Sequence, residues 1–241
     1  SEDESEKQKY DNDRWLISTF MFSLKILKKH CSKEWLPVFE LNNKIVKFKA
    51  KERIFSEGDA VKYIYFIESG TVKVLSKFNE KEEKIIRIAG DGMILGHRGI
   101  NAKNFPVTAE TLTETVVTSV PMDVFLKIIK ANPNMSVYLI NFMSDELRDG
   151  EERMKTLLIL DPKVRIAIIL VRLIDHFGYD KKIKNKPKII LSRTDIANMA
   201  GTTYETVIRT LALFKDSNIL QIEGKQILLI DEKELRRIAS H

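Results

Sequence analysis

Apolar and polar residues alternate with a period of two along the segment from Ile45 to Val120. The alternating runs read IVKFK, YIYFI, TVKVLSKF, KIIRIA, VTAETL and TVVTSV. Turn-forming residues separate these runs, among them Ser69-Gly70 and Gly90-Asp91-Gly92. Several short strands that recur about every 8–12 residues are typical of a β-sandwich or a β-barrel. The pattern therefore predicts a domain of this kind between Ile45 and Val120.

From Pro121 the pattern takes the period of a helix. It predicts a short helix to about Lys130 and, after Asn132-Pro133, a long helix to about Ile159. Along the long helix, apolar residues and one glycine follow a spacing of 3, 4, 3, 4 and 3: Ile140, Met143, Leu147, Gly150, Met154 and Leu157. This heptad seam extends over about 24 residues, or about 36 Å of helix. A period near 3.5 favours a coiled-coil partner, and hence a homodimer. The alternative is a helix that packs on its own β-domain.

Asp161-Pro162 ends the long helix and forms a plausible hinge. An amphipathic helix is predicted from Lys163 to Phe177. Near the end of the chain, NILQIEGKQILLI alternates around Glu223-Gly224-Lys225, which predicts a small hairpin or wing. Asp231 is expected to cap a final short helix.

Between these elements, Leu191–Lys215 reads as two short helices joined by a tight turn at Gly201. Ser192 is expected to cap the first helix, with Asp195 in the capping-box position. Thr202 is expected to cap the second helix, with Glu205 in the corresponding position. Glycine is favoured just past a helix end, where the backbone turns left-handed. The stretch therefore predicts a helix-turn-helix.

The second helix divides into two faces. Val207, Thr210, Leu211 and Phe214 follow the i, i+3, i+4, i+7 spacing of a buried face. Tyr204, Glu205, Ile208, Arg209 and Ala212 are left facing outward. Arginine suits guanine and glutamate suits the cytosine amine in the major groove of DNA, so this helix is predicted to read bases. The predicted DNA-binding residues are Thr203, Tyr204, Glu205, Ile208, Arg209, Ser192 and Lys225. The alternative is that Glu205 is only a capping residue, with Arg209 as its salt-bridge partner on a solvated helix.

Charge supports the DNA-binding interpretation. The chain has 241 residues, 44% of them hydrophobic and 31% charged, as expected of a globular protein with one large or two ordinary domains. The formal charge is +6, and all of it lies from Pro162 onward, where 15 Lys and Arg face 9 Asp and Glu. The rest of the chain has 25 residues of each sign. Net positive charge around the helix-turn-helix suits contacts to phosphates. The lysine-rich stretch Lys181–Lys188 is also compatible with an ordinary solvated loop.

Other functional classes receive no support. The single cysteine, Cys31, excludes an intramolecular disulfide and a cysteine-rich metal site. The four histidines are scattered, and no catalytic triad, carboxylate pair or metal-ligand spacing stands out, so we expect neither an enzyme nor a metal site. The acidic, polar start does not resemble a signal peptide, and no apolar run is long enough to span a bilayer. We therefore expect a cytoplasmic protein with no membrane contact. Residues 1–13 are expected to be disordered, and the apolar segment Trp15–Leu27 is either a buried helix or a partner surface.

Several short motifs are similar to those of a known protein family. They are Glu57-Gly58-Asp59, Tyr65-Phe66-Ile67 with Ser69-Gly70, Gly92 with Gly96, Leu160-Asp161 with Arg165-Ile166-Ala167, and Glu205-Thr206-Val207 with Arg209. In these motifs and their order, the chain resembles the cyclic-AMP receptor protein / fumarate-nitrate regulator (Crp/Fnr) family of bacterial transcription factors. The resemblance extends from about Ile45 to Ile230.

The resemblance implies an α+β fold in four parts. These are an N-terminal segment (1–37), an effector-binding-like β-roll of jelly-roll type (38–133), a dimerisation helix (134–160) and a winged helix-turn-helix domain (161–241). The implied function is that of a homodimeric, sequence-specific DNA-binding regulator that acts with RNA polymerase. Its dimer interface is expected to contain Ile140, Met143, Leu147, Met154 and Leu157. Its DNA site is expected to be an inverted repeat with a GA core. Tyr204 departs from the cyclic-AMP receptor pattern, which has Arg there, so the outer bases are expected to differ.

The effector region departs further from the family pattern. Members that bind cyclic AMP have Glu after the glycine that matches Gly96, and an Arg-Ser or Arg-Thr pair for the phosphate. Here His97 follows Gly96, and Phe105-Pro106 stands in place of the pair. We therefore expect an unidentified small effector other than cyclic AMP, in a pocket formed by Gly96, His97, Arg98, Phe105 and Val107, and no cofactor. Haem held by His97, with Met93 or Cys31 as a further ligand, is an alternative. The rival function is an effector-binding or haem-based sensor whose helix-turn-helix contacts a protein.

Overall fold

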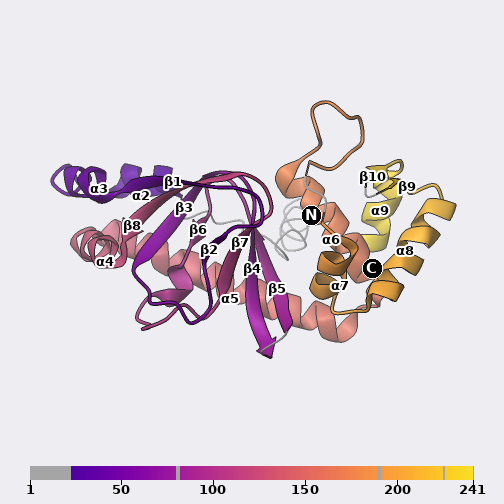
Figure 1. Cartoon of the computed structure of the whole chain (residues 1–241), viewed down its shortest axis with the longest axis horizontal. Coiled ribbons are helices and arrows are strands. Elements are labelled where there is room, and N and C mark those ends of the chain that lie inside the picture. The colour runs from indigo at the N-terminus through magenta and orange to yellow at the C-terminus, as the bar shows by residue number, and fades with distance from the viewer. Residues whose placement is uncertain (1–22, 80–81, 189–190, 225, 241) are drawn as a thin grey trace, which may run out of the picture. The chain divides into compact units, whose positions relative to one another are not determined.

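The computed structural model describes residues 23–79, 82–188, 191–224 and 226–240. Two of the sequence-based expectations lie wholly or partly outside these ranges: the role of Lys225 and the structure of residues 1–22. The chain forms two compact units, and the boundary between them falls inside one long helix, between Leu147 and Arg148. Figure 1 shows the β-strands of the first unit and the mainly helical second unit.

The first unit is a β-roll made of two antiparallel sheets. One sheet has the order β1-β8-β3-β6 and the other has the order β2-β7-β4-β5. The strand bounds are β1 Lys44–Phe48, β2 Arg53–Phe55, β3 Tyr63–Ser69, β4 Val72–Asn79, β5 Glu82–Ala89, β6 Ile94–Leu95, β7 Thr108–Thr111 and β8 Thr115–Pro121. The six strands that the alternating pattern predicts are all present, whereas the very short β2 and β6 were not predicted.

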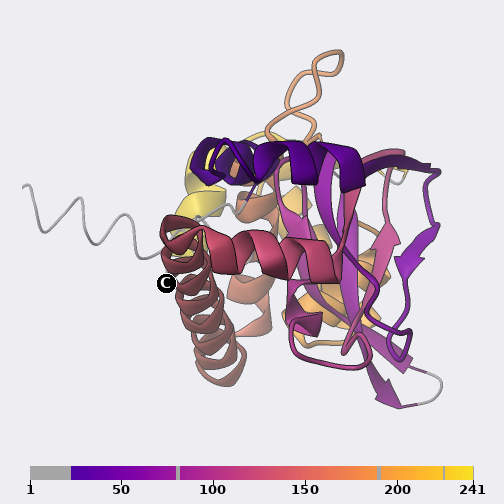
Figure 2. The ribbon, with the colours of Figure 1, turned by 90° about the vertical axis from the view of Figure 1, so that its left-hand side faces the viewer.

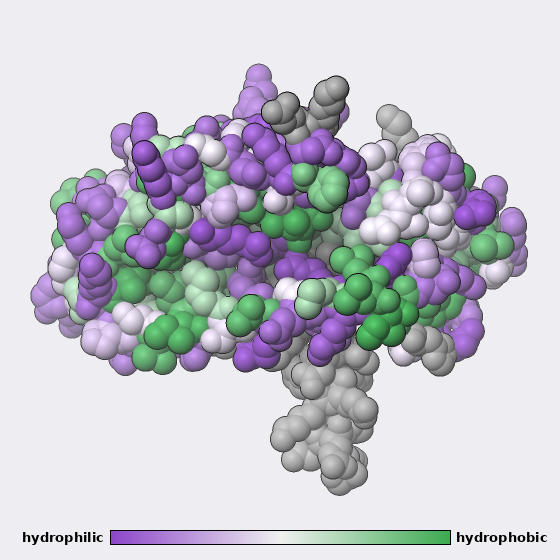
Figure 3. All heavy atoms as spheres, turned by 90° about the horizontal axis from the view of Figure 1, so that it is seen from below, coloured by the Kyte–Doolittle hydropathy of each residue, from purple (hydrophilic) through white to green (hydrophobic). Residues whose placement is uncertain are grey.

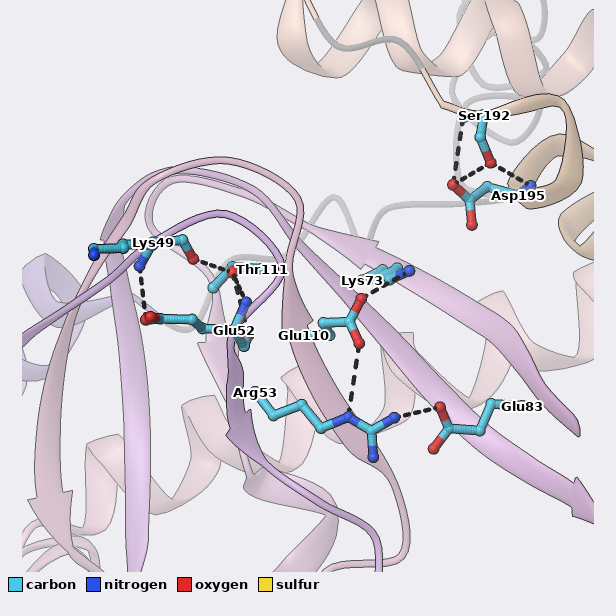
Figure 4. A network of polar contacts seen from close by, with 9 residues as sticks. All are labelled: Lys49, Glu52, Arg53, Lys73, Glu83, Glu110, Thr111, Ser192 and Asp195. Atoms are coloured by element: carbon cyan, nitrogen blue, oxygen red, sulfur yellow. Dashed lines mark hydrogen bonds and ion pairs between the residues drawn. The ribbon is translucent and has the colours of Figure 1, made fainter. Parts of the chain in front are cut away.

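Polar contacts link neighbouring strands of the second sheet to one another and to the turn before β2 (Figure 4). Glu110 of β7 lies 2.9 Å from the Lys73 ammonium and 3.6 Å from Arg53, which in turn contacts Glu83 at 2.8 Å. Thr111 donates a hydrogen bond to the Lys49 carbonyl at 2.6 Å. The Arg53–Glu83 pair is partly exposed, and a pair of that kind typically contributes less than about 1 kcal/mol, whereas Thr111 is buried.

The turn at Gly70 requires glycine. Its φ is +114°, and a Cβ there would lie 2.5 Å from the Thr115 hydroxyl and 2.6 Å from the Glu114 carbonyl. Any side chain would therefore both strain the backbone and collide with the start of β8. This geometry explains why a glycine follows β3 in the sequence.

Helices cover the first sheet of the β-roll. These are α2 Leu24–His30, α3 Leu36–Asn42 and α4 Met122–Ala131, and α3 and α4 both contact β8. Figure 2 shows α3 and α4 beside the strands. The core between them consists of large apolar side chains: Leu27, Phe39, Ile64, Phe66, Ile94, Val120, Met122, Phe125, Ile128, Ile129, Met135 and Phe142. Full burial of each large side chain contributes about 1.5–3 kcal/mol. Leu27 is therefore a core residue, which answers part of the question about Trp15–Leu27.

The long helix α5 runs from Pro133 to Ile159, as predicted. Within the β-roll unit, Met135 and Phe142 join the core. These two residues lie on a different side of the helix from Ile140 and Leu147, which are exposed. The helix therefore packs on its own β-domain through a face that includes only Met143 of the predicted heptad seam.

The second unit is a winged helix-turn-helix. It contains α6 Pro162–Phe177, α7 Arg193–Ala200, α8 Tyr204–Asp216, a hairpin of β9 Leu220–Glu223 and β10 Gln226–Leu229, and α9 Glu232–Ala239. Pro162 occupies the first turn of α6, and the Asp161 side chain accepts a hydrogen bond from the Lys163 amide at 2.8 Å. Asp231 caps α9 by accepting from the Glu234 amide at 2.9 Å, as predicted.

Candidate nucleic-acid interface and effector region

The helix-turn-helix begins with a complete capping box at Ser192. The Ser192 hydroxyl accepts from the Asp195 amide at 3.0 Å, and the Asp195 carboxylate accepts from the Ser192 amide at 3.3 Å (Figure 4). Gly201 ends α7 with φ 56° and ψ 46°, in the left-handed conformation that the sequence predicted. Both predictions are confirmed.

The expected cap of the second helix was wrong by one residue. Thr203, not Thr202, caps α8, because its hydroxyl accepts from the Thr206 amide at 3.2 Å. The Thr202 amide instead donates to the Ala197 carbonyl at 3.0 Å, which is one of the bonds that close α7. Thr202 therefore still belongs to the end of the first helix, and the second can begin only after it.

The faces of α8 are those that the sequence predicted. Val207, Thr210, Leu211 and Phe214 are buried, while Tyr204, Glu205, Ile208, Arg209 and Ala212 are exposed. Arg209 lies 3.5 Å from the Thr206 hydroxyl, and the described residues include no ion pair between Arg209 and Glu205. The structure therefore gives no support to the interpretation of these two side chains as a mutual salt bridge. Both are available to a partner on the exposed face.

A groove with a volume of about 740 Å³ runs beside this face, between α8, the start of α7 and the wing. Its polar lining includes Ser192, Arg193, Thr194, Tyr204 and Lys215. Cations and hydroxyls next to a reading helix are the groups that bind nucleic-acid phosphates. Arg193 and Lys215 were not identified from the sequence, because only the fold brings them to the same groove as Tyr204.

Arg165 fixes the turn of the helix-turn-helix. Its guanidinium, which is buried, donates to the Leu157 carbonyl at 2.6 Å and lies 3.4 Å from the Gly201 carbonyl. One side chain of α6 thus joins the last turns of α5 to the glycine turn before α8. Arg165 belongs to the motif Arg165-Ile166-Ala167, but the sequence alone predicted no role for it.

The lysine-rich segment between α6 and α7 is mostly exposed, including Lys181, Lys182, Lys184 and Lys188. Lys186 differs, because its ammonium lies 3.4 Å from Asp180. The Leu229 amide of the wing donates to the Asn185 carbonyl at 2.7 Å, so the segment is attached to β10. Exposed lysines of this segment therefore lie next to the wing.

The predicted dimer seam is solvent-exposed in the single chain. The exposed fractions are 63% for Ile140, 65% for Leu147, 59% for Met154 and 41% for Leu157. Met143 is partly buried and packs against the β-roll core, so it belongs less clearly to this stripe. Figure 3 shows hydrophobic groups among hydrophilic ones on one face of the molecule. We call Ile140, Leu147, Met154 and Leu157 the α5 stripe.

In the effector region, Phe105, one of the two residues expected in place of the phosphate-binding pair, belongs to a stack of aromatic side chains. Phe105 is buried and stacks on Phe55, with ring centroids 4.0 Å apart. Phe55 in turn stacks on Tyr65 at 5.6 Å. A Cβ on Gly96 would lie 3.2 Å from the Phe105 ring, so the predicted pocket residues Gly96 and Phe105 are in contact with each other. Val107 is also buried.

His97 and Arg98, the other two predicted pocket residues, face a carboxylate that the sequence did not reveal. Arg87 of β5, His97 and Arg98 all approach the same Oε2 atom of Glu146 on α5, at 2.9, 3.4 and 3.5 Å. Burial alone would raise the pKa of Glu146, but the charge of Arg87 and the contacts of His97 and Arg98 outweigh it and lower the pKa to about 2. Burial lowers the pKa of His97 below its ordinary value. We call these four residues the Glu146 cluster.

The sequence contained only a weak signal for the Glu146 cluster. Arg87 interrupts the apolar run KIIRIA at a position that proves to be buried, and a buried charge requires a partner. Nothing in the sequence identified Glu146 as that partner, because many other carboxylates are present. In the described part of the chain, no three His, Cys, Asp or Glu side chains gather as a metal site, and no helix has the length and apolarity to cross a bilayer.

A β-roll followed by a long helix and a winged helix-turn-helix defines the class of transcriptional regulators with an N-terminal sensory-type domain. Residues 45–132 match the model of the cyclic nucleotide-binding domain, and residues 164–238 match that of the Crp-like helix-turn-helix domain. The chain belongs to the Crp/Fnr family of transcriptional regulators. This confirms the predicted family and fold class, and the relatives named below are regulators rather than enzymes.

Three similar proteins illustrate the relationship. Electron transport regulator A of Shewanella oneidensis is 28% identical over 192 residues, which cover 79% of this chain and 76% of that protein. The fumarate and nitrate reduction regulatory protein of Escherichia coli is 27% identical over 192 residues, with coverage of 79% and 76%. The solved structure of FixK2 from Bradyrhizobium japonicum has a TM-score of 0.71 at 23% identity and covers 81% of this chain and 96% of that one.

The family model that residues 45–132 match is named for cyclic-nucleotide binding, which depends on groups that can hold a buried phosphate. A buried phosphate needs a cation or a cluster of hydrogen-bond donors. Phe105, which is expected in place of the Arg of the family's nucleotide binders, packs its ring on Phe55. Arg98, the one arginine of the predicted pocket, contacts Glu146, as does Arg87.

Proposed function

We propose that this protein is a homodimeric, sequence-specific DNA-binding regulator whose α8 helix reads an inverted repeat. The observation that carries the proposal is the exposed face of α8, where Glu205 and Arg209 lie one turn apart without an ion pair between them. Arg209 would bond the guanine of a central GA step, and Glu205 would accept from a cytosine amine. Tyr204 and Ile208 would favour thymine methyl groups at the outer positions.

Phosphate contacts would hold α8 in the major groove. The groove lined by Ser192, Arg193 and Lys215 supports this role, as does the charge of +6 that lies beyond Pro162. Contacts of this kind carry no sequence information but fix the register of the reading helix. RNA polymerase is the proposed protein partner of the bound regulator, and the cytoplasm its proposed place of action.

The homodimer would form along the α5 stripe. Support comes from four large apolar side chains that are 41–65% exposed in one chain and lie at heptad spacing. A two-fold interface would present two identical reading helices, so the DNA half-sites should lie about 34–36 Å apart, centre to centre.

The effector would be a small molecule other than cyclic AMP. The packed Phe105 ring supports this, because it stands where a phosphate would need a cation. Haem is not proposed either, since His97 is buried against Glu146 and its ring packs edge-on against Phe142, with centroids 5.1 Å apart. Calorimetry that detected micromolar cyclic-AMP binding, or a haem band lost in His97→Ala, would reject the respective statement.

Selection from random duplexes tests the proposed DNA readout. The expected result is enrichment of an inverted repeat with a GA step in each half-site, approximately TTGA. Titration with salt should show affinity falling steeply as salt rises, because bound phosphates release counterions. Enrichment of direct repeats or of sites without the GA step would show that α8 does not read DNA as proposed, and the absence of salt-dependent binding would reject DNA as the partner.

A further inference from the structure

The Glu146 cluster joins two parts of the β-roll unit that are distant in sequence. Arg87 belongs to β5, His97 and Arg98 to the short turn that follows β6, and Glu146 to α5. Three nitrogen-bearing side chains therefore converge from the roll on one oxygen of a helix residue. Only the Arg87 contact, at 2.9 Å, has the length of a strong hydrogen bond, while those of His97 and Arg98 at 3.4 and 3.5 Å are electrostatic contacts.

Because the side chains of this cluster are largely buried, an anion is the partner that suits its basic groups. The side chain of Arg87 is 3% exposed, that of His97 5% and that of Glu146 11%. A guanidinium this far from water needs a negative partner, and a carboxylate satisfies it with both charge and hydrogen bonding. Neither Nδ1 nor Nε2 of His97 makes a regular hydrogen bond to any described residue, so His97 retains unused hydrogen-bonding capacity at the site.

We propose that Arg87, His97 and Arg98 form a carboxylate-binding site, and that Glu146 is its built-in ligand. Glu146 supplies from within the chain the anion that this region would otherwise take from outside, and it holds the first half of α5 on the β-roll. In the family's cyclic-AMP binders, by contrast, the residue in the position of His97 is a carboxylate for the ribose hydroxyls. Glu146 is thus a positioning residue for the dimer helix and, through it, for DNA binding.

Phe142 supports the position of the histidine. It lies one turn before Glu146 on α5, and its ring meets that of His97 edge-on at 5.1 Å. The helix therefore holds His97 by an apolar contact and a charged contact at once. Loss of the carboxylate would leave the apolar contact in place, so a variant at Glu146 is expected to keep the fold while the site becomes vacant.

Chemical rescue tests the proposal. Glu146→Ala removes the carboxylate and leaves room beside Arg87, and sodium acetate is then added at constant ionic strength against sodium chloride. Two properties are measured: the melting temperature without DNA, and the affinity for the selected duplex. We expect Glu146→Ala to melt lower and to bind DNA about tenfold more weakly than wild type. Acetate should restore much of both losses, whereas neutral acetamide should restore neither.

Controls separate the site from the general effect of salt. Glu152→Ala removes a carboxylate of the same helix that is 49% exposed and pairs with Lys155 at 3.2 Å. Acetate should not change the melting temperature of this variant, and its affinity for DNA should equal that of wild type. Glu146→Gln keeps the side-chain shape without the charge and should lose DNA affinity in a stably folded protein. Wild type should not gain stability from acetate, because Glu146 already occupies the site.

The inference rests on the proposed DNA binding only for its second readout. If wild type binds no duplex, the proposed function fails, while the melting temperature still tests the site. The proposal is overturned if acetate and acetamide act alike on Glu146→Ala, if acetate stabilises wild type as much as the variant, or if Glu146→Gln and Glu146→Ala both match wild type in stability.

Discussion

Replacement of Leu147 by Glu tests the α5 stripe most directly. Leu147 is 65% exposed in the single chain, so a dimer that covers it would bury about two thirds of a leucine side chain. Full burial of leucine contributes about 1.5–3 kcal/mol, which gives about 1–2 kcal/mol per copy and about 2–4 kcal/mol for the two copies of a symmetric dimer. Every 1.4 kcal/mol is about tenfold, so the lost burial alone should raise the dimer dissociation constant about 30-fold to 1000-fold. Two carboxylates forced into one seam would weaken it further.

Sedimentation or light scattering over a range of protein concentrations measures this change. Wild type should remain dimeric at concentrations at which Leu147→Glu is monomeric. The variant should also bind the selected duplex at least about tenfold more weakly, because a monomer presents one reading helix instead of two. Met154→Glu should behave in the same way.

Leu41→Glu is the matched control. Leu41 is 85% exposed on α3, outside the α5 stripe, so the same substitution there should leave the dimer intact. Circular dichroism should show all of these variants folded, since none of the three positions is in the core. A Leu147→Glu protein that remains a dimer with wild-type affinity would refute the assignment of the interface to α5.

Three further changes test other parts of the structure. Arg209→Ala should cost about 1–3 kcal/mol on the specific duplex and flatten discrimination at one base pair, whereas Lys188→Ala should weaken all sequences alike and reduce the salt slope. Thr203→Ala should lower the free energy of unfolding by about 1 kcal/mol in urea titrations and Thr202→Ala by less, because Thr203 caps α8; equal effects would contradict the cap. The lowered pKa of Glu146 contributes stability that is present above about pH 4.5 and is lost as pH falls toward about 2, up to about 3 kcal/mol. Glu146→Gln should therefore destabilise the protein at neutral pH and match wild type near pH 2; a constant difference across that range would contradict the shift.

The helix-turn-helix was the part of the protein most open to prediction. Its capping box, its glycine turn and the two faces of α8 all depend on interactions within about ten residues. Interactions between residues this close in the chain can be predicted from the sequence. The wrong prediction at Thr202 shows the limit of prediction from local sequence. Thr202 and Thr203 are equally good caps by residue type, and the choice depended on how the preceding helix closes through the Thr202 amide and the Ala197 carbonyl.

The predicted effector pocket was a collection of neighbours in sequence, and the fold divided it into two environments. Gly96 lies beside Phe105, which stacks on Phe55, whereas His97 and Arg98 face Glu146. The sequence could show that the phosphate-binding pair is missing. It could not show what replaces it, because Phe55 is 50 residues away from Phe105 and Glu146 is 49 residues away from His97, and they meet only through the sheet and the long helix.

The sequence by itself thus determined the elements, the family and the exposed face of α8, because periodicity, caps and short motifs act over one or two turns of chain. The tertiary structure alone decided which face of α5 is covered and which remains exposed, and it alone revealed the partner of the buried Arg87. A buried charge implies that an oppositely charged partner is present. Which residue is that partner depends on distances in the folded chain. For Arg87 the partner is Glu146, 59 residues further along the chain, brought within 2.9 Å by the packing of α5 on the β-roll.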